Sequence, residues 1–275
     1  MMKLLSIILI FTIVSIDQTI NALSWDETYP KGQVIPVNDL NVYSVGKSAR
    51  NLSIIVIYDI YGFNISQTRV FCDRLASEYS VHVVMPDLFR GTAAPATGNR
   101  TVWMAGVNNW TKISTDLQNV ADWLHKSFST TKIGLIGFCW GGLQVVRACS
   151  NLSSLFFTGV SIHGSSLTPF EVSQLQKPML FIAAGNDPAL QPNISNAIEQ
   201  LNTKISQQCE YKTYSDMRHG FVAAGANYSN PDNVRAIDDV QLTVRNYLDK
   251  INNISLRLSI DLYFLLTLLL SLIFI

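Results

Sequence analysis

The chain has 275 residues, 48% of them apolar, and its 20 acidic and 20 basic side chains give a formal net charge of zero. This length is compatible with one α/β domain that buries a sizeable core. Because no run of Lys or Arg breaks the neutral balance, the composition excludes a protein held to nucleic acid or to acidic membranes by charge.

Residues 1–22 have the pattern of a secretory signal peptide. Lys3 supplies a short basic start, the segment from Leu4 to Ile16 is almost wholly apolar, and Ala22 is the candidate cleavage point. The apolar run is shorter than the roughly 20 residues that span a bilayer. An uncleaved N-terminal anchor is the alternative, because Ile20 stands where a small residue is preferred.

Strands and helices alternate along residues 23–253, which we interpret as the folded domain. The predicted strands are Ser53–Tyr58, Val81–Met85, Lys132–Ile136, Phe156–Ile162, Met179–Ala184 and Glu210–Tyr214, and the predicted helices are Thr68–Tyr79, Ile113–Phe128, a segment after Gly142, and Asn233–Leu248. Short β-branched runs indicate buried strands, and apolar residues at helical spacing indicate the helices. This alternation predicts an α/β fold with a mostly parallel central sheet, helices on both faces, and functional loops at the carboxyl ends of strands. The Gly/Pro/Thr-rich stretch 91–110 is the candidate lid.

The sharpest local motif is Gly137-Phe138-Cys139-Trp140-Gly141-Gly142, which follows a predicted strand and precedes a predicted helix. It matches the nucleophile elbow, with Cys139 where Ser is commoner. The backbone of the nucleophile is strained, so side chains two residues before and two residues after it would collide. Glycine at both positions avoids this collision. A helix N-terminus also favours a thiolate. The alternative is a buried structural cysteine beside a tight turn.

A cysteine nucleophile needs a base, and the base needs an orienting acid. In folds with this elbow the chain order is nucleophile, acid, histidine, which excludes His82 and His125. His219 follows the last predicted strand, whereas His163 precedes any suitable acid and is interpreted as structural or as part of a pocket lining. Asp187, directly after the strand Met179–Ala184, is the predicted acid; Asp216 competes but lies too close to His219 in the chain.

No pair of His or Cys has the spacing of metal ligands, so the sequence predicts neither a metal nor a cofactor. Cys72 could pair with Cys149 or Cys209 in an oxidising compartment, and the sequence does not choose between them.

The last 22 residues, 254–275, end in an uncharged apolar run from Leu262 to Ile275. Small residues at Asn253 and Ser255, a spacer, and then this tail form the order of a GPI-attachment signal. A tilted transmembrane helix starting near Leu256, or a buried terminal helix, are the alternatives. The first two would put the protein on the outer face of a membrane.

Asn-x-Ser/Thr sequons agree with a route through the secretory pathway. They begin at Asn51, Asn64, Asn99, Asn109, Asn151, Asn193, Asn227 and Asn253. Eight sequons among twenty Asn exceed the roughly three that chance would give, although each matters only in a secreted chain and on an accessible surface.

Five segments, in chain order, resemble the dienelactone hydrolase family of the α/β-hydrolase superfamily. They are Ile57–Asn64 after an early strand, the turn Pro86-Asp87-Leu88-Phe89, the elbow Gly137–Gly142, Asp187, and the triplet His219-Gly220-Phe221. The resemblance covers nearly all of the chain between its two terminal segments, and it implies an α/β-hydrolase fold.

The resemblance also implies a mechanism. It implies a catalytic triad of Cys139, Asp187 and His219, with an oxyanion hole made by the backbone N–H groups of Ile60 and Trp140. The implied reaction is acyl transfer: Cys139 attacks an ester or lactone carbonyl, and water then releases the acyl group. The expected partner is therefore a small-molecule ester or lactone.

Two departures from the family leave the substrate open. Asp59 stands where bacterial members have a longer glutamate, so it either helps control the thiol or only fixes the backbone of its loop. The stretch Phe221–Gly225 lacks the cation that many members carry, and Arg90 is a possible substitute in the pocket or a solvated loop residue. These departures motivate a second hypothesis, a catalytically silent binding module on a hydrolase fold.

Overall fold

The computed structural model describes residues 30–49 and 51–273, with side chains as far as Asn253. One eight-stranded sheet with the order β1-β2-β4-β3-β5-β6-β7-β8 forms its centre. The strands are β1 (Gln33–Val37), β2 (Leu40–Val45), β3 (Leu52–Ile57), β4 (His82–Pro86), β5 (Lys132–Phe138), β6 (Thr158–Ile162), β7 (Met179–Ala184) and β8 (Glu210–Tyr214). Strands β3 to β8 run parallel, and β1 and β2 add an antiparallel edge.

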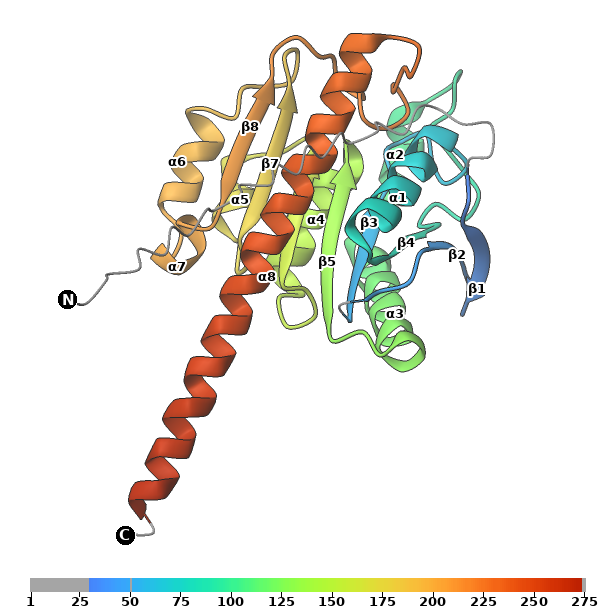
Figure 1. The fold of residues 1–275 in the computed structure, drawn as a ribbon. Helices are drawn as coiled ribbons and strands as arrows, with labels where there is room; N and C mark the ends of the chain where they lie inside the picture. Colours follow the sequence, from blue (N-terminus) through green and yellow to red (C-terminus); the bar gives the residue numbers. More distant parts are fainter. Residues whose placement is uncertain (1–29, 50, 274–275) are drawn as a thin grey trace, which may run out of the picture.

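Helices cover both faces of this sheet (Figure 1). They are α1 (Ser66–Tyr79), α2 (Arg100–Val107), α3 (Trp110–Phe128), α4 (Trp140–Asn151), α5 (Pro169–Ser173), α6 (Asn193–Glu199), α7 (Thr203–Ser206) and α8 (Pro231–Ile273). Helices α1 and α8 lie side by side on one face, and α3 and α4 lie on the other (Figure 1). Strands β3, β4, β5, β6 and β7 are buried along their whole length, apart from the half-buried first residue of β5, because both faces are covered.

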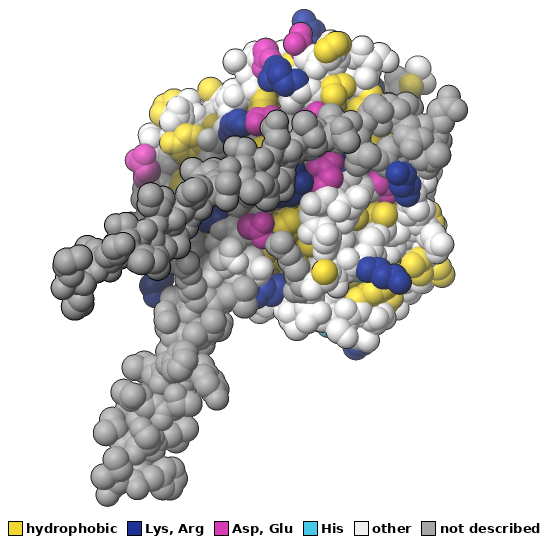
Figure 2. Space-filling view, in the orientation of Figure 1, with side chains coloured by type: hydrophobic (Ala, Val, Ile, Leu, Met, Phe, Trp, Pro, Cys, Tyr) yellow, Lys and Arg dark blue, Asp and Glu magenta, His cyan; other side chains and the backbone are white. Residues whose placement is uncertain are grey.

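The sequence correctly predicts this α/β-hydrolase architecture, including the strands Met179–Ala184 and Glu210–Tyr214 to the residue. It does not predict β1, β2, α2, α5, α6 or α7, and α8 is longer than the predicted helix Asn233–Leu248. On the face shown in Figure 2, basic and acidic side chains lie among one another, in keeping with the neutral composition.

The predictions for the two ends of the chain concern residues that lie largely outside the described part of the structure. The signal peptide, residues 1–22, lies outside the described residues, as do the side chains of the tail, residues 254–275. Within the described part of the chain, no helix is both long enough and apolar enough to cross a membrane.

Candidate active site

Cys139 lies on a sharp turn between β5 and α4. Its backbone has φ 52° and ψ −113°, a conformation that L-residues rarely adopt. A side chain at Gly137 would put a Cβ 2.2 Å from the carbonyl oxygen of Gly141, and one at Gly141 would put it 2.2 Å from that of Ile57. The two glycines are therefore required because α4 starts in direct contact with the ends of β5 and β3.

Asp187 and His219 meet at the carboxyl ends of the neighbouring strands. Asp187 follows β7, and its Oδ2 accepts a hydrogen bond from the Ala184 N–H at 2.7 Å. Its Oδ1 lies 2.5 Å from Nδ1 of His219, which follows β8. The Asn186 side chain also accepts the backbone N–H of His219 at 2.7 Å. The histidine is thus held both at its ring and at its backbone.

The charges around His219 favour its protonated form. Hydrogen bonds with Asp187 and with Cys139 raise the pKa of His219 to about 10, although burial opposes the shift. Burial would raise the pKa of Asp187, but the hydrogen bonds from His219 and from the Ala184 N–H outweigh it and lower that pKa. The structure therefore brings Cys139, His219 and Asp187 into one connected series, as the chain order predicts.

A cavity of about 290 Å³ opens beside these groups. Its lining includes the thiol of Cys139, the imidazole of His219, and residues of the early loop and of the loop after β8: Asp59, Ile60, Tyr61, Ile65, Gly220, Ala224 and Gly225. Among these described lining residues, none is Lys or Arg. The described lining therefore offers no Lys or Arg side chain to a negatively charged group.

Asp59 lines this cavity and also joins two of its loops. The carboxylate accepts the Tyr61 N–H at 2.9 Å and the Ala224 N–H at 3.2 Å. It is 3% exposed, and burial raises its pKa even though the two backbone bonds oppose the shift. The side chain thus fixes the geometry of both loops while remaining part of the cavity wall.

Of the two predicted oxyanion donors, Trp140 directly follows Cys139 in the chain and Ile60 lines the same cavity. Trp140 is the first residue of α4, so its N–H has no acceptor within the helix. Ile60 lines the cavity, and its carbonyl oxygen accepts the Ala94 N–H at 2.8 Å, which fixes that peptide in the early loop. Their role as an oxyanion hole stays a prediction.

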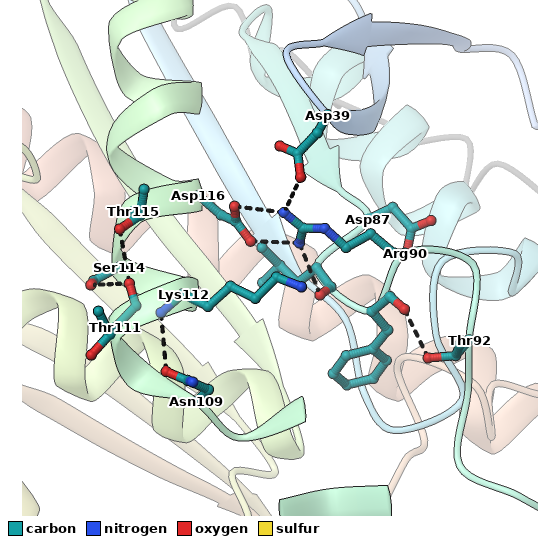
Figure 3. A network of polar contacts seen from close by, with 12 residues as sticks. Asp39, Asp87, Arg90, Thr92, Asn109, Thr111, Lys112, Ser114, Thr115 and Asp116 are labelled. Atoms are coloured by element: carbon teal, nitrogen blue, oxygen red, sulfur yellow. Dashed lines mark hydrogen bonds and ion pairs between the residues drawn. The ribbon is translucent and has the colours of Figure 1, made fainter. Parts of the chain in front are cut away.

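Arg90 is not among the residues that line the cavity. Its guanidinium forms two hydrogen bonds with Asp116, at 2.7 and 2.9 Å, and a third with Asp39 at 2.8 Å (Figure 3). These three bonds join the loop after β4 to α3 and to the β1–β2 turn. Arg90 thus connects these elements, and its place in a substrate pocket stays a prediction that the lining of this cavity does not support.

Two further residues around the site are not singled out, or not fully interpreted, from the sequence. Ser165 lies just past β6, with its hydroxyl oxygen 3.6 Å from Sγ of Cys139. His163 is fully buried, with its ring centroid 4.9 Å from that of His219. Burial and the charge on His219 lower the pKa of His163 to about 3, so it is neutral. Because β6 is next to β5, a correct strand order would have pointed to both residues.

The other residues considered from the sequence lie in different surroundings. His82 bonds to Ser44 at 2.8 Å, and His125 to the carbonyl oxygen of Thr130 at 2.6 Å. Asp216 pairs with Arg235 rather than with His219.

The described residues contain no cluster of three or more His, Cys, Asp or Glu that could hold a metal ion. All four cysteines are free thiols, including Cys72, Cys149 and Cys209, so neither pairing considered from the sequence is present.

The mostly parallel sheet, the elbow at the end of β5 and the acid and histidine after β7 and β8 define an α/β-hydrolase. The model of the dienelactone hydrolase family matches residues 40–251. The chain belongs to the dienelactone hydrolase family and is an ester-cleaving hydrolase.

Individual relatives agree with this assignment. The carboxymethylenebutenolidase homolog of Homo sapiens is 28% identical over 226 residues, which cover 80% of this chain and 91% of that protein. The homolog of Mus musculus is 29% identical over 212 residues, covering 72% and 82%. Among solved structures, a dienelactone hydrolase from Anabaena variabilis has a TM-score of 0.57 at 16% identity and covers 80% of this chain and 96% of its own.

Proposed function

We propose that this protein hydrolyses small, uncharged carboxylic esters or lactones through a covalent intermediate on Cys139. The observation that carries the proposal is the connected series Cys139, His219 and Asp187, the first two of which line one cavity. Each of the three comes from the carboxyl end of a different strand, so the sheet itself sets their spacing.

The first half of the reaction forms an acyl-enzyme. The Cys139 sulfur, whose proton His219 holds, attacks the carbonyl carbon, and the N–H groups of Ile60 and Trp140 stabilise the charge that develops on the carbonyl oxygen. When the intermediate collapses, the carbon–oxygen bond to the alcohol breaks, and His219 donates a proton to the departing oxygen. Asp187 holds Nδ1, so Nε2 is the ring atom left for this transfer.

The second half returns the enzyme to its starting state. A water molecule gives a proton to the now neutral His219 and adds to the thioester carbonyl. The carbon–sulfur bond then breaks and releases the carboxylic acid. With a lactone, the alcohol stays attached to the acyl group, and the product is a hydroxy acid.

The lining of the cavity favours uncharged substrates. The position at which many family members carry a cation is occupied by the small residues Ala223, Ala224 and Gly225, and Asp59 adds a carboxyl group to the wall. Arg90, the replacement considered from the sequence, is paired with Asp116 and Asp39. A negatively charged lactone would therefore find no Lys or Arg side chain among the described residues of the lining.

The proposed place of the reaction is the outer face of a membrane or the extracellular medium. Two features of the sequence support it: the signal-peptide pattern of residues 1–22 and the apolar tail, residues 254–275.

The test is hydrolysis of short p-nitrophenyl esters by the full chain, compared with the Cys139→Ala variant. Removing a nucleophile should lower kcat by at least about 10³-fold. Cys209→Ala, which removes a thiol outside the lining of this cavity, is the matched control and should keep the wild-type rate. Equal background rates for wild type and Cys139→Ala, in folded protein, would instead favour the silent binding module.

A further inference from the structure

The asparagines of the eight sequons play no part in the proposed hydrolase reaction, and they share one structural property. The side chain of each of these asparagines is exposed. Two of the eight, Asn99-Arg100-Thr101 and Asn109-Trp110-Thr111, carry Thr at the third position, and together they flank α2.

These two asparagines have the same role in the backbone. Each is the N-cap of a helix, with Asn99 before α2 and Asn109 before α3. Oδ1 of Asn99 accepts the N–H groups of Thr101 and Val102, at 3.0 and 3.2 Å. Oδ1 of Asn109 accepts the N–H of Lys112 at 3.2 Å (Figure 3). Both caps therefore use the oxygen of the amide and leave Nδ2 on the exposed side chain for another bond.

That division of the amide matters because an N-linked glycan is attached at Nδ2. The attached amide keeps its carbonyl oxygen, so it still accepts the capping bonds. A glycan at either position is thus compatible with the folded helix ends. The surroundings are also open: α2 has no buried residue, and Val102 on its surface is 67% exposed.

We propose that Asn99 and Asn109 are N-glycosylation sites whose glycans cover the outer surface of α2. The donor is a lipid-linked diphosphate oligosaccharide. Nδ2 forms a bond to the anomeric carbon of the sugar, the bond from that carbon to the diphosphate oxygen breaks, and Nδ2 loses a proton. This inference needs entry into the secretory pathway, but it does not depend on the hydrolase activity.

The experiment expresses the full chain in cultured animal cells and treats the purified protein with a peptide N-glycosidase, which converts a glycosylated Asn to Asp. Peptide mass spectrometry should find Asp at positions 99 and 109 after treatment only. Thr101→Ala and Thr111→Ala should each remove one glycan, since both residues are exposed and the capping N–H groups belong to the backbone. Thr101→Ser and Thr111→Ser keep the sequons and should keep the glycans.

Unmodified Asn at both positions in the wild-type chain would overturn the proposal, whether the chain fails to enter the secretory pathway or enters it without modification. So would glycans found only at other sequons. Ester hydrolysis measured on the same samples tests the proposed function separately, because the alanine variants do not alter the cavity that Cys139 lines.

Discussion

At the scale of single residues, the imidazole of His219 lies between two groups that both favour its charged form. Asp187 makes the stronger contribution and Cys139 the second. The neutral ring of His163 packs edge-on against it and adds no competing charge. A protonated His219 is the form that can donate to a leaving alcohol, so the site is prepared for the step that frees the product.

The raised pKa gives a pH prediction. The rate kcat/KM for ester hydrolysis should fall as pH rises towards about 10, where His219 loses its proton. In Asp187→Asn the largest cause of the shift is weakened, so the fall should begin at a lower pH. Full pH–rate profiles of the two proteins check this, and identical alkaline limbs would contradict it.

The same group links stability to pH. Folded His219 holds its proton up to a pKa of about 10, whereas the unfolded chain releases it near the ordinary value of 6.5. Between these values the folded state binds more protons, so the free energy of unfolding should fall as pH rises. Urea unfolding at several pH values measures the slope, which should be smaller in Asp187→Asn.

Asp59 gives a prediction of a different kind. In Asp59→Asn, one of the two backbone N–H groups, of Tyr61 or Ala224, would face an amide nitrogen instead of an oxygen. Leaving such a buried donor unpaired costs about 1–3 kcal/mol of unfolding free energy, and kcat/KM should fall because both loops line the site. Asp39→Asn, which alters an exposed carboxylate, is the control and should leave both quantities unchanged. Wild-type stability and activity in Asp59→Asn would show that this carboxylate does not hold the loops.

At the scale of elements, the most deeply buried segments are ones that the sequence predicts correctly, and exposed segments are among those that it misses. β7 and the β5–α4 elbow are predicted because their apolar runs are continuous and glycines mark the turn. β1 is missed because it lies at the edge of the sheet, is mostly exposed and contains Pro36. α2 is missed because none of its residues is buried. Arg90 could not be assigned correctly, since its partners lie 26 and 51 residues away and only the fold brings them together.

The elbow supplies a prediction at this scale, with a helix glycine as its control. Gly141→Ala places a Cβ 2.2 Å from the backbone oxygen of Ile57, so α4 must move away from β3. We expect a loss of about 1–3 kcal/mol in unfolding free energy, together with a fall in kcat as Cys139 shifts. Gly106→Ala in α2 meets no atom within 4 Å and should stabilise the protein by about 0.5–1 kcal/mol. Urea unfolding of both variants compares them, and equal effects would mean that the close contact at the elbow is relieved without cost.

At the scale of the whole molecule, α8 connects the domain to the end of the chain. Its first part packs on the sheet and beside α1, where the Gln241 amide donates to the carbonyl oxygen of Phe71 at 3.2 Å. Val244, Leu248 and Ile251 on the same helix are buried. The helix then continues past the end of the sheet (Figure 1). The family match ends at residue 251, so it includes the packed part of α8, and the rest of the helix lies beyond the match.

This division predicts the behaviour of two truncated chains. A chain that ends at Asn253 keeps every residue of α8 whose side chain is described as buried, so it should fold, hydrolyse esters at the wild-type rate and, in animal cells, appear in the medium. A chain that ends at Asp239 loses Val240, Val244 and Leu248, all fully buried, and should fail to fold.

The full chain should fractionate with membranes. Its release by a phosphatidylinositol-specific phospholipase would identify a GPI anchor, and retention after that treatment a membrane-spanning one. Equal secretion of the full chain and of the chain ending at Asn253 would show that residues 254–275 do not anchor the protein to a membrane. The enzyme would then act on esters in free solution.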